Sequence, residues 1–199
     1  PVKRDVVGRK PMSLAFDRLE THSEGLIALT AGSEGALARL IADGQQLKAE
    51  AYLDRLEALF PERLYIELSR RSDAIEEAAE IALIDLAYAR NLPIVATNPA
   101  AYADPAFHAA HDAMLCIANS AYVESAERPT SSADAWLKDG AAMAELFADL
   151  PEALANTAVI AQRCAVAAPS RKPILPRLSD HEDEQLRCDA RAGLAARLL

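Results

Sequence analysis

Three short apolar runs recur along the chain, and segments with helical periodicity separate them. The runs are LIALT at 26–30, RLYIEL at 63–68 and PIVAT at 93–97. A short run that is apolar at most positions is typical of a strand buried on both faces of a parallel sheet. The alternation of these runs with helical segments over short connections predicts an α/β fold with parallel strands.

The helical segments are predicted from apolar stripes and from residues that favour helix ends. Ser33 is a candidate N-cap for the second helix, and Asp73 with Glu76 has the spacing of a capping box. Pro151 is predicted at the first turn of another helix, where its missing N–H would be unpaired in any case. The predicted helices are 13–22, 34–43, 45–60, 74–90, 104–118, 140–150, 151–164 and 181–199, and a surface loop is predicted at 119–135.

The last part of the chain has a different character. Three prolines fall within APSRKPILPR, so this segment is expected to be extended. We therefore divide the chain into an α/β domain at 1–168 and, at 169–199, a proline-rich linker with a terminal amphipathic helix. Three strands are too few for an α/β barrel, so we expect roughly half of such an architecture to lie before Pro1, in a longer protein.

Composition and charge narrow the class of protein. The chain has 199 residues, of which 51% are hydrophobic and 26% charged, which is ordinary for a soluble globular protein. A net charge of −9 disfavours binding to phosphate backbones by this segment alone. Three widely spaced cysteines without a CxxC motif favour a reducing cytoplasm over disulfides or a zinc site. No apolar run approaches the ~20 residues of a membrane span, so no membrane contact is expected.

Two histidines are the first candidates for chemistry. His108 and His111 are three residues apart on one predicted helix, with Asp112 adjacent, and could present two metal ligands on one face. Without a further ligand from another element, the same spacing is explained by surface or capping histidines.

A carboxylate within a strand is the second candidate. Glu67 lies in an apolar run, where an unpaired charge is costly, so it is either a site residue or the salt-bridge partner of Arg70 or Arg71. The two arginines could bind an anion or balance charge at the start of the next helix. Cys164 is predicted to be a packing thiol on an apolar helix face. Because the chain also has no glycine-rich phosphate loop and no GxSxG motif, its residues complete no active site by themselves.

Several longer segments carry a family resemblance. They are SEGLIALTAG, RLYIEL, DLAYARNLPIVATN, AHDAMLCIA, AELFADLPEALANTAVIAQRC and RKPILPR, in this order. From about Leu14 onward, the chain resembles the alpha subunits of bacterial replicative DNA polymerase III. The resemblance assigns 1–168 to the back part of a PHP (polymerase and histidinol phosphatase) domain and 169–199 to the start of the polymerase region. It implies a partial, distorted (β/α) barrel followed by a mostly helical tail.

The resemblance also concerns metal binding, because metal-binding PHP domains hold a metal cluster at the C-terminal ends of their strands. It implies a cysteine ligand at the position of Gly32, and an aspartate and a histidine at the positions of Pro99 and Ala101. None of the side chains present here supplies a donor atom. The resemblance thus implies no catalytic residue, metal or cofactor in this segment. The residues expected to line a vestigial pocket are Glu67, Thr97 and Asn98.

Three functions are open at this point. The first is a non-catalytic scaffold that contacts the proofreading exonuclease subunit and other replisome subunits, while Mg²⁺-dependent nucleotidyl transfer and DNA binding belong to regions outside the chain. The second is an active metal-dependent PHP phosphoesterase or exonuclease that uses Glu67, His108 or His111. The third is an α/β binding module unrelated to replication. Because a partial barrel leaves apolar surface uncovered, the fragment is also expected to self-associate.

Overall fold

The structure is a computed structural model that describes residues 16–171, 173–174, 176–177 and 179–198. The chain divides into two compact units, with the division between Cys164 and Ala165. A compact unit need not coincide with a family domain, so the domain boundary at 168/169 stays a prediction.

A parallel sheet of three strands forms the centre of the first unit. Its strands, in spatial order, are β1 (Ala28–Leu29), β2 (Leu64–Leu68) and β3 (Ile94–Ala96). Both pairs are parallel, with Leu29 opposite Tyr65 and Glu67 opposite Val95. The α/β class and the parallel strands are therefore confirmed, although each strand is shorter than its apolar run. The described strands form an open sheet, and the barrel stays a prediction.

Helices follow each strand, as the periodicity predicted. In the first unit the α-helices are α1 (Phe16–Glu20), α2 (Ala36–Ala42), α3 (Gln46–Leu59), α4 (Ala74–Arg90), α5 (His108–Ala118), α6 (Gly140–Leu146) and α7 (Pro151–Arg163), and the 3-10 helices are η1 (Gly32–Glu34) and η2 (Pro105–Phe107). Pro151 occupies the first turn of α7, as expected. The segment 119–135 contains neither helix nor strand, which confirms the predicted loop.

Two predicted helix caps differ from the structure. Ser33 is not the N-cap of α2, because it lies within η1 and Gly35 takes the capping position. Asp73 does cap α4, since its carboxylate accepts hydrogen bonds from the N–H groups of the next turn. The reciprocal half of the capping box is absent from this described helix start, because the Glu76 carboxylate binds Arg71 instead. A guanidinium is a stronger donor to a carboxylate than a neutral backbone N–H is.

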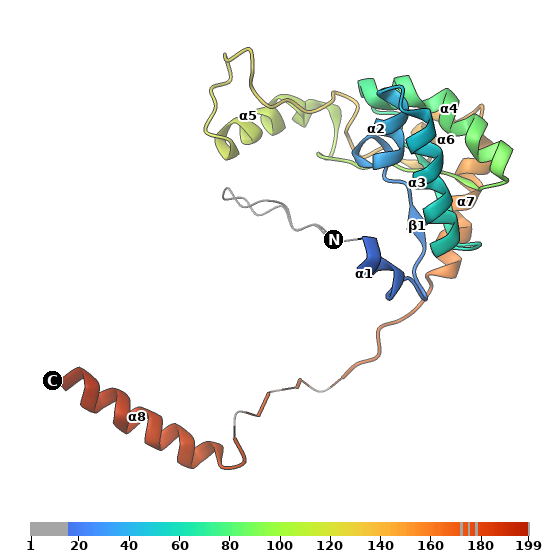
Figure 1. Cartoon of the computed structure of the whole chain (residues 1–199). Coiled ribbons are helices and arrows are strands. Elements are labelled where there is room, and N and C mark those ends of the chain that lie inside the picture. The colour runs from blue at the N-terminus through green and yellow to red at the C-terminus, as the bar shows by residue number, and fades with distance from the viewer. Residues whose placement is uncertain (1–15, 172, 175, 178, 199) are drawn as a thin grey trace. The chain divides into compact units, whose positions relative to one another are not determined.

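One face of the sheet packs against the helices and forms the core. The core residues on this face are Leu64, Ile66, Leu68, Ile94 and Ala96, and the helices contribute Leu37, Leu53, Leu83 and Phe147. α2 packs against both α3 and α4, and Figure 1 shows β1 entering the unit below α2. Because side chains alternate along a strand, Glu67 and Val95 point to the opposite face. The Glu67 side chain therefore lies on the face of the sheet opposite these core residues.

The end of the first unit corrects one prediction. Cys164 is exposed at the C-terminal cap of α7 and is not a packing thiol. The buried contact of this helix lies near its N-terminal end, at Ala153, so its last turn reaches solvent. The second unit contains α8 (Glu182–Leu198), all of whose described side chains are exposed. Among the described residues, no helix combines the length and the apolar character needed to cross a membrane.

Candidate functional site

Glu67 lies at the C-terminal end of β2 and contacts segments that follow both other strands. Its carboxylate accepts hydrogen bonds from the backbone N–H of Ala31 at 2.9 Å and from the hydroxyl of Thr97 at 2.7 Å. The backbone N–H of Glu67 donates to the hydroxyl of Thr30 at 2.9 Å. These residues meet because strands that run parallel end at the same edge of a sheet. Glu67 thus connects the ends of all three strands.

Of the two roles left open for Glu67, the salt bridge to Arg70 or Arg71 is wrong. Within the described residues, Glu67 forms no ion pair with Arg70 or Arg71, because backbone and hydroxyl donors already bind its carboxylate. Arg71 instead pairs with Glu76 at 2.7 Å. Since Glu76 lies in the first turn of α4, this pair corresponds to the predicted charge balance at the helix start.

Arg70 joins α4 to the turn between α6 and α7. It binds Glu80 at 2.7 Å, and both oxygens of Asp149 at 2.6 and 2.7 Å. Its guanidinium also donates to the carbonyl of Leu146 at 2.6 Å and lies over the ring of Phe147. The hydrogen bonds from Asp149 and Glu80 raise the pKa of Arg70 above its usual value. With these partners, Arg70 serves the packing of the helices and is not arranged as an anion site.

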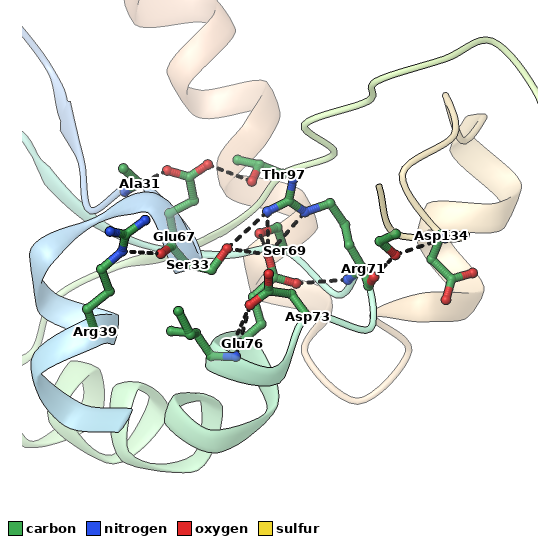
Figure 2. Close-up of polar contacts among 12 residues, drawn as sticks. Ala31, Ser33, Arg39, Glu67, Ser69, Arg71, Asp73, Glu76, Thr97 and Asp134 are labelled. Carbon is green, nitrogen blue, oxygen red and sulfur yellow. Dashed lines mark hydrogen bonds and ion pairs between the residues drawn. The ribbon is translucent and has the colours of Figure 1, made fainter. Parts of the chain in front are cut away.

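A buried polar cluster lies beside Glu67, between the turn after β1 and the start of α4 (Figure 2). Its centre is Glu76, which is 7% exposed. One oxygen of this carboxylate accepts hydrogen bonds from the Ser69 hydroxyl and the Arg71 guanidinium, both at 2.7 Å. The other accepts from the backbone N–H of Arg71 at 2.9 Å. The Ser33 hydroxyl lies 3.2 Å from the Arg71 guanidinium and 3.4 Å from Glu76.

Gly32 adjoins this cluster at the position where the resemblance implies a cysteine ligand. Its φ of +48° is in the left-handed region, and a Cβ atom added there would lie 2.9 Å from Ser69 Oγ. The space that a side chain would enter is therefore taken by a hydroxyl that is itself bound to Glu76. A ligand at this position would have to displace Ser69.

The loop after β3 contains the other two positions at which the resemblance implies metal ligands, and also Asn98. Pro99 and Ala101 are exposed, and the backbone N–H of Ala101 donates to the carbonyl of Ala135 at 2.7 Å. Both polar side-chain atoms of Asn98 are buried and have no hydrogen-bond partner among the described residues. The structure thus brings Glu67 and Thr97 together and leaves the amide of Asn98 unpaired within the described part of the chain, while a vestigial pocket lined by these three residues stays a prediction.

The two histidines of α5 bind the loop 119–135. His108 Nε2 lies 3.0 Å from the Ser131 carbonyl, and His111 Nδ1 lies 3.0 Å from the Ser131 hydroxyl. Asp112 accepts hydrogen bonds from the backbone and hydroxyl of Ser131, at 2.9 and 2.8 Å, and from Arg128 at 2.8 Å. These contacts attach the loop to α5, which corresponds to the structural alternative for the histidines.

Serine, histidine and aspartate meet here without forming an activated nucleophile. The Ser131 hydroxyl donates directly to Asp112, and the hydrogen bonds from Ser131 and Arg128 hold the pKa of this carboxyl well below its usual range. A general base needs a pKa near the working pH, so Asp112 is a poor proton acceptor. Ser131 and Arg128 are partners of Asp112 that sequence reasoning missed, since no local motif connects them to α5.

The described residues at the three implied positions supply no side-chain ligand for a PHP-type metal cluster. Pro99 and Ala101 are exposed and have no donor atoms in their side chains. At Gly32, an added side chain would meet Ser69. Transition-metal sites need about four to six donors, and the Glu67 carboxylate is already engaged. In the described ranges, no group of three or more His, Cys, Asp or Glu side chains is placed to hold a metal ion.

Comparison with known proteins defines the class of this chain. Residues 6–71 match the PHP domain family, which is consistent with the parallel strands and helices of the first unit. The chain is 42% identical over 185 residues to the DNA polymerase III subunit alpha of Caulobacter vibrioides, covering 91% of this chain and 16% of that protein. The identity to the same subunit is 38% over 187 residues in Pseudomonas aeruginosa and 34% over 180 residues in Escherichia coli, with 92% and 88% of this chain covered and 16% of each relative.

These matches confirm the resemblance found in the sequence. The chain is a relative of the bacterial DNA polymerase III alpha subunits, and it spans 16% of the length of the relatives it matches. The reading as an α/β module unrelated to these polymerases is therefore wrong.

Proposed function

We propose that this chain is the back part of the PHP domain of a bacterial DNA polymerase III alpha subunit and that it acts as a non-catalytic scaffold. In this proposal, template-directed DNA synthesis, which we expect to require Mg²⁺, belongs to regions of the intact polymerase outside the chain. The similarity over 91% of the chain to a DNA polymerase III alpha subunit supports the assignment. The net charge of −9 is consistent with DNA being bound elsewhere.

The observation that carries the non-catalytic assignment is the packing at Gly32. A PHP-type phosphoesterase needs metal ions at the strand ends to activate water. A side chain at Gly32 would meet Ser69 Oγ at 2.9 Å, so a ligand there requires rearrangement of a buried cluster. Pro99 and Ala101 supply no donor atoms in the loop on the other side of Glu67.

The open sheet of the described residues supports a scaffold role toward the rest of the polymerase, because its order is β1-β2-β3 and two of its strands are edge strands. The unpaired N–H and C=O groups of an edge strand are a template for pairing with another segment. We propose that regions of the polymerase outside this chain complete this sheet, and that the domain as a whole presents a surface to the proofreading exonuclease subunit.

Titration calorimetry with Mn²⁺ and with Zn²⁺ tests the absence of a metal site. The wild-type chain is expected to show no stoichiometric binding and no rise in melting temperature with either ion. The control is the double variant His108→Ala/His111→Ala, which should give the same result. Tight stoichiometric binding that the double variant loses, together with metal-dependent phosphodiester hydrolysis, would establish the phosphoesterase instead.

The proposed contact with the exonuclease subunit has its own test. The purified exonuclease subunit is immobilised, and binding of the chain is measured by interferometry with α-lactalbumin, another small acidic protein, as the control. Saturable binding of this chain alone is the expected result, and equal signals for both proteins would refute a specific contact.

A further inference from the structure

The guanidinium of Arg71 is placed where it can connect the loops at the strand ends. In Figure 2 the side chain of Arg71 lies between Ser33, Ser69 and Glu76. It binds Glu76 through Nε at 3.0 Å and Nη2 at 2.7 Å, and Nη2 also donates to the hydroxyl of Ser33 at 3.2 Å. The Arg71 side chain is only 17% exposed, so these contacts form in a largely dehydrated environment.

The backbone of Arg71 extends the same set of contacts. Its N–H donates to the second oxygen of Glu76 at 2.9 Å. Its carbonyl accepts a hydrogen bond from the hydroxyl of Ser132. The neighbouring Ser72 hydroxyl contacts the carboxylate of Asp134 at 2.5 Å, so a second pair joins the same two segments.

Three separate segments are therefore joined through one residue. Ser33 belongs to the turn after β1, Arg71 itself follows β2, and Ser132 belongs to the loop 119–135, which comes after β3 and α5. A bare carboxylate at the position of Glu76 would be costly, because a buried charge needs a partner. The planar guanidinium meets this need and leaves donors for a neighbouring loop, which a lysine ammonium cannot do with the same geometry.

We propose that the Arg71 guanidinium is the built-in cation of this strand-end site and holds the turn after β1 against the start of α4, while the Arg71 backbone carbonyl anchors the loop 119–135. This inference rests on the proposed function, because it explains how a PHP domain without metal ligands at Gly32, Pro99 and Ala101 keeps its strand-end loops in place. Arg71 is a positioning residue in this proposal. Its role is to order the turn 31–35 and the segment 131–135 relative to β2.

Hydrogen exchange read by mass spectrometry tests the proposal in the full chain. Arg71→Lys keeps the charge and the backbone carbonyl but loses the paired hydrogen bonds to Glu76 and the contact with Ser33, so peptides covering 31–35 should exchange about tenfold faster or more, and peptides covering 131–135 should change less. Arg70→Lys is the matched control, because Arg70 is similarly buried at 19% exposure but binds Glu80 and Asp149. It should accelerate exchange at 146–150 and leave the other two peptides unchanged.

A milder variant guards against loss of the fold in Arg71→Lys. Ser132→Ala removes only the hydroxyl that binds the Arg71 carbonyl, so exchange should rise at 131–135 and stay unchanged at 31–35. Unchanged exchange at 31–35 in Arg71→Lys, unchanged exchange at 131–135 in Ser132→Ala, or a uniform rise along the chain in Arg71→Lys would overturn the proposal. Metal titration of the wild type decides the proposed function separately, since stoichiometric Mn²⁺ binding would refute that function whatever the exchange pattern.

Discussion

Replacement of Gly32 by alanine tests the closed packing of the strand-end site most directly. The residue has a φ of +48°, and a Cβ atom at this position would lie 2.9 Å from Ser69 Oγ. Real Cβ atoms do not approach an oxygen this closely, so Ser69 must move. Because the Ser69 hydroxyl binds the buried Glu76 carboxylate at 2.7 Å, its movement disturbs the centre of the cluster.

The expected loss of stability has two parts. A left-handed backbone conformation costs alanine about 1–2 kcal/mol relative to glycine. Overpacking against Ser69 adds about 1–3 kcal/mol. Gly44 separates these parts, because its φ is +69° and a Cβ added there meets nothing within 4 Å. We therefore expect Gly44→Ala to lower the free energy of unfolding by about 1–2 kcal/mol and Gly32→Ala to lower it by about 2–5 kcal/mol.

Urea denaturation followed by circular dichroism measures both values. A double-mutant cycle with Ser69→Ala then isolates the contact, since removal of the hydroxyl removes the clash. In the Ser69→Ala background, Gly32→Ala should cost no more than Gly44→Ala does in the wild type. If Gly32→Ala and Gly44→Ala destabilise the chain equally, within about 0.5 kcal/mol, then a side chain fits beside Ser69 and the packing argument against a ligand fails.

Three further predictions concern other parts of the first unit. Gly35→Ala should lower the free energy of unfolding by about 3 kcal/mol or more in the same urea assay, because an added Cβ would lie 1.8 Å from the backbone oxygen of Thr30. Asp112→Asn should destabilise the chain by about 2 kcal/mol at pH 7. Hydrogen bonds lower the pKa of Asp112 in the folded state, so the difference in stability between wild type and variant should shrink as the pH falls below about 4. Melting curves recorded at several pH values measure this difference. The wild-type chain should self-associate in sedimentation velocity, with Ile117→Asp reducing the effect, since Ile117 is 80% exposed on α5; a monomer at all concentrations would contradict this.

Local sequence patterns determined the secondary structure of this protein. Mostly apolar runs indicated three parallel strands, and Asp73 marked the start of α4 by a hydrogen bond that spans two residues. The loop 119–135 and the helix beginning at Pro151 were equally predictable. Each of these features depends on interactions between residues close together in the chain, so a short segment of sequence contains both interacting residues. The family resemblance could also be found from the sequence alone, because it rests on short motifs that follow one another in order.

Only the tertiary structure decided which polar groups meet. Glu67 binds Ala31 and Thr97, which lie far from it in the sequence, and not the arginines a few residues away. Arg71 reaches a serine that follows another strand, while Cys164 proved exposed because only the first part of its helix is buried. The face of the sheet toward which a side chain points depends on the position of its residue in the strand, and its neighbours depend on how the strands are aligned with one another. Those quantities are set by packing between distant segments, and hydrophobic periodicity along one segment cannot specify them.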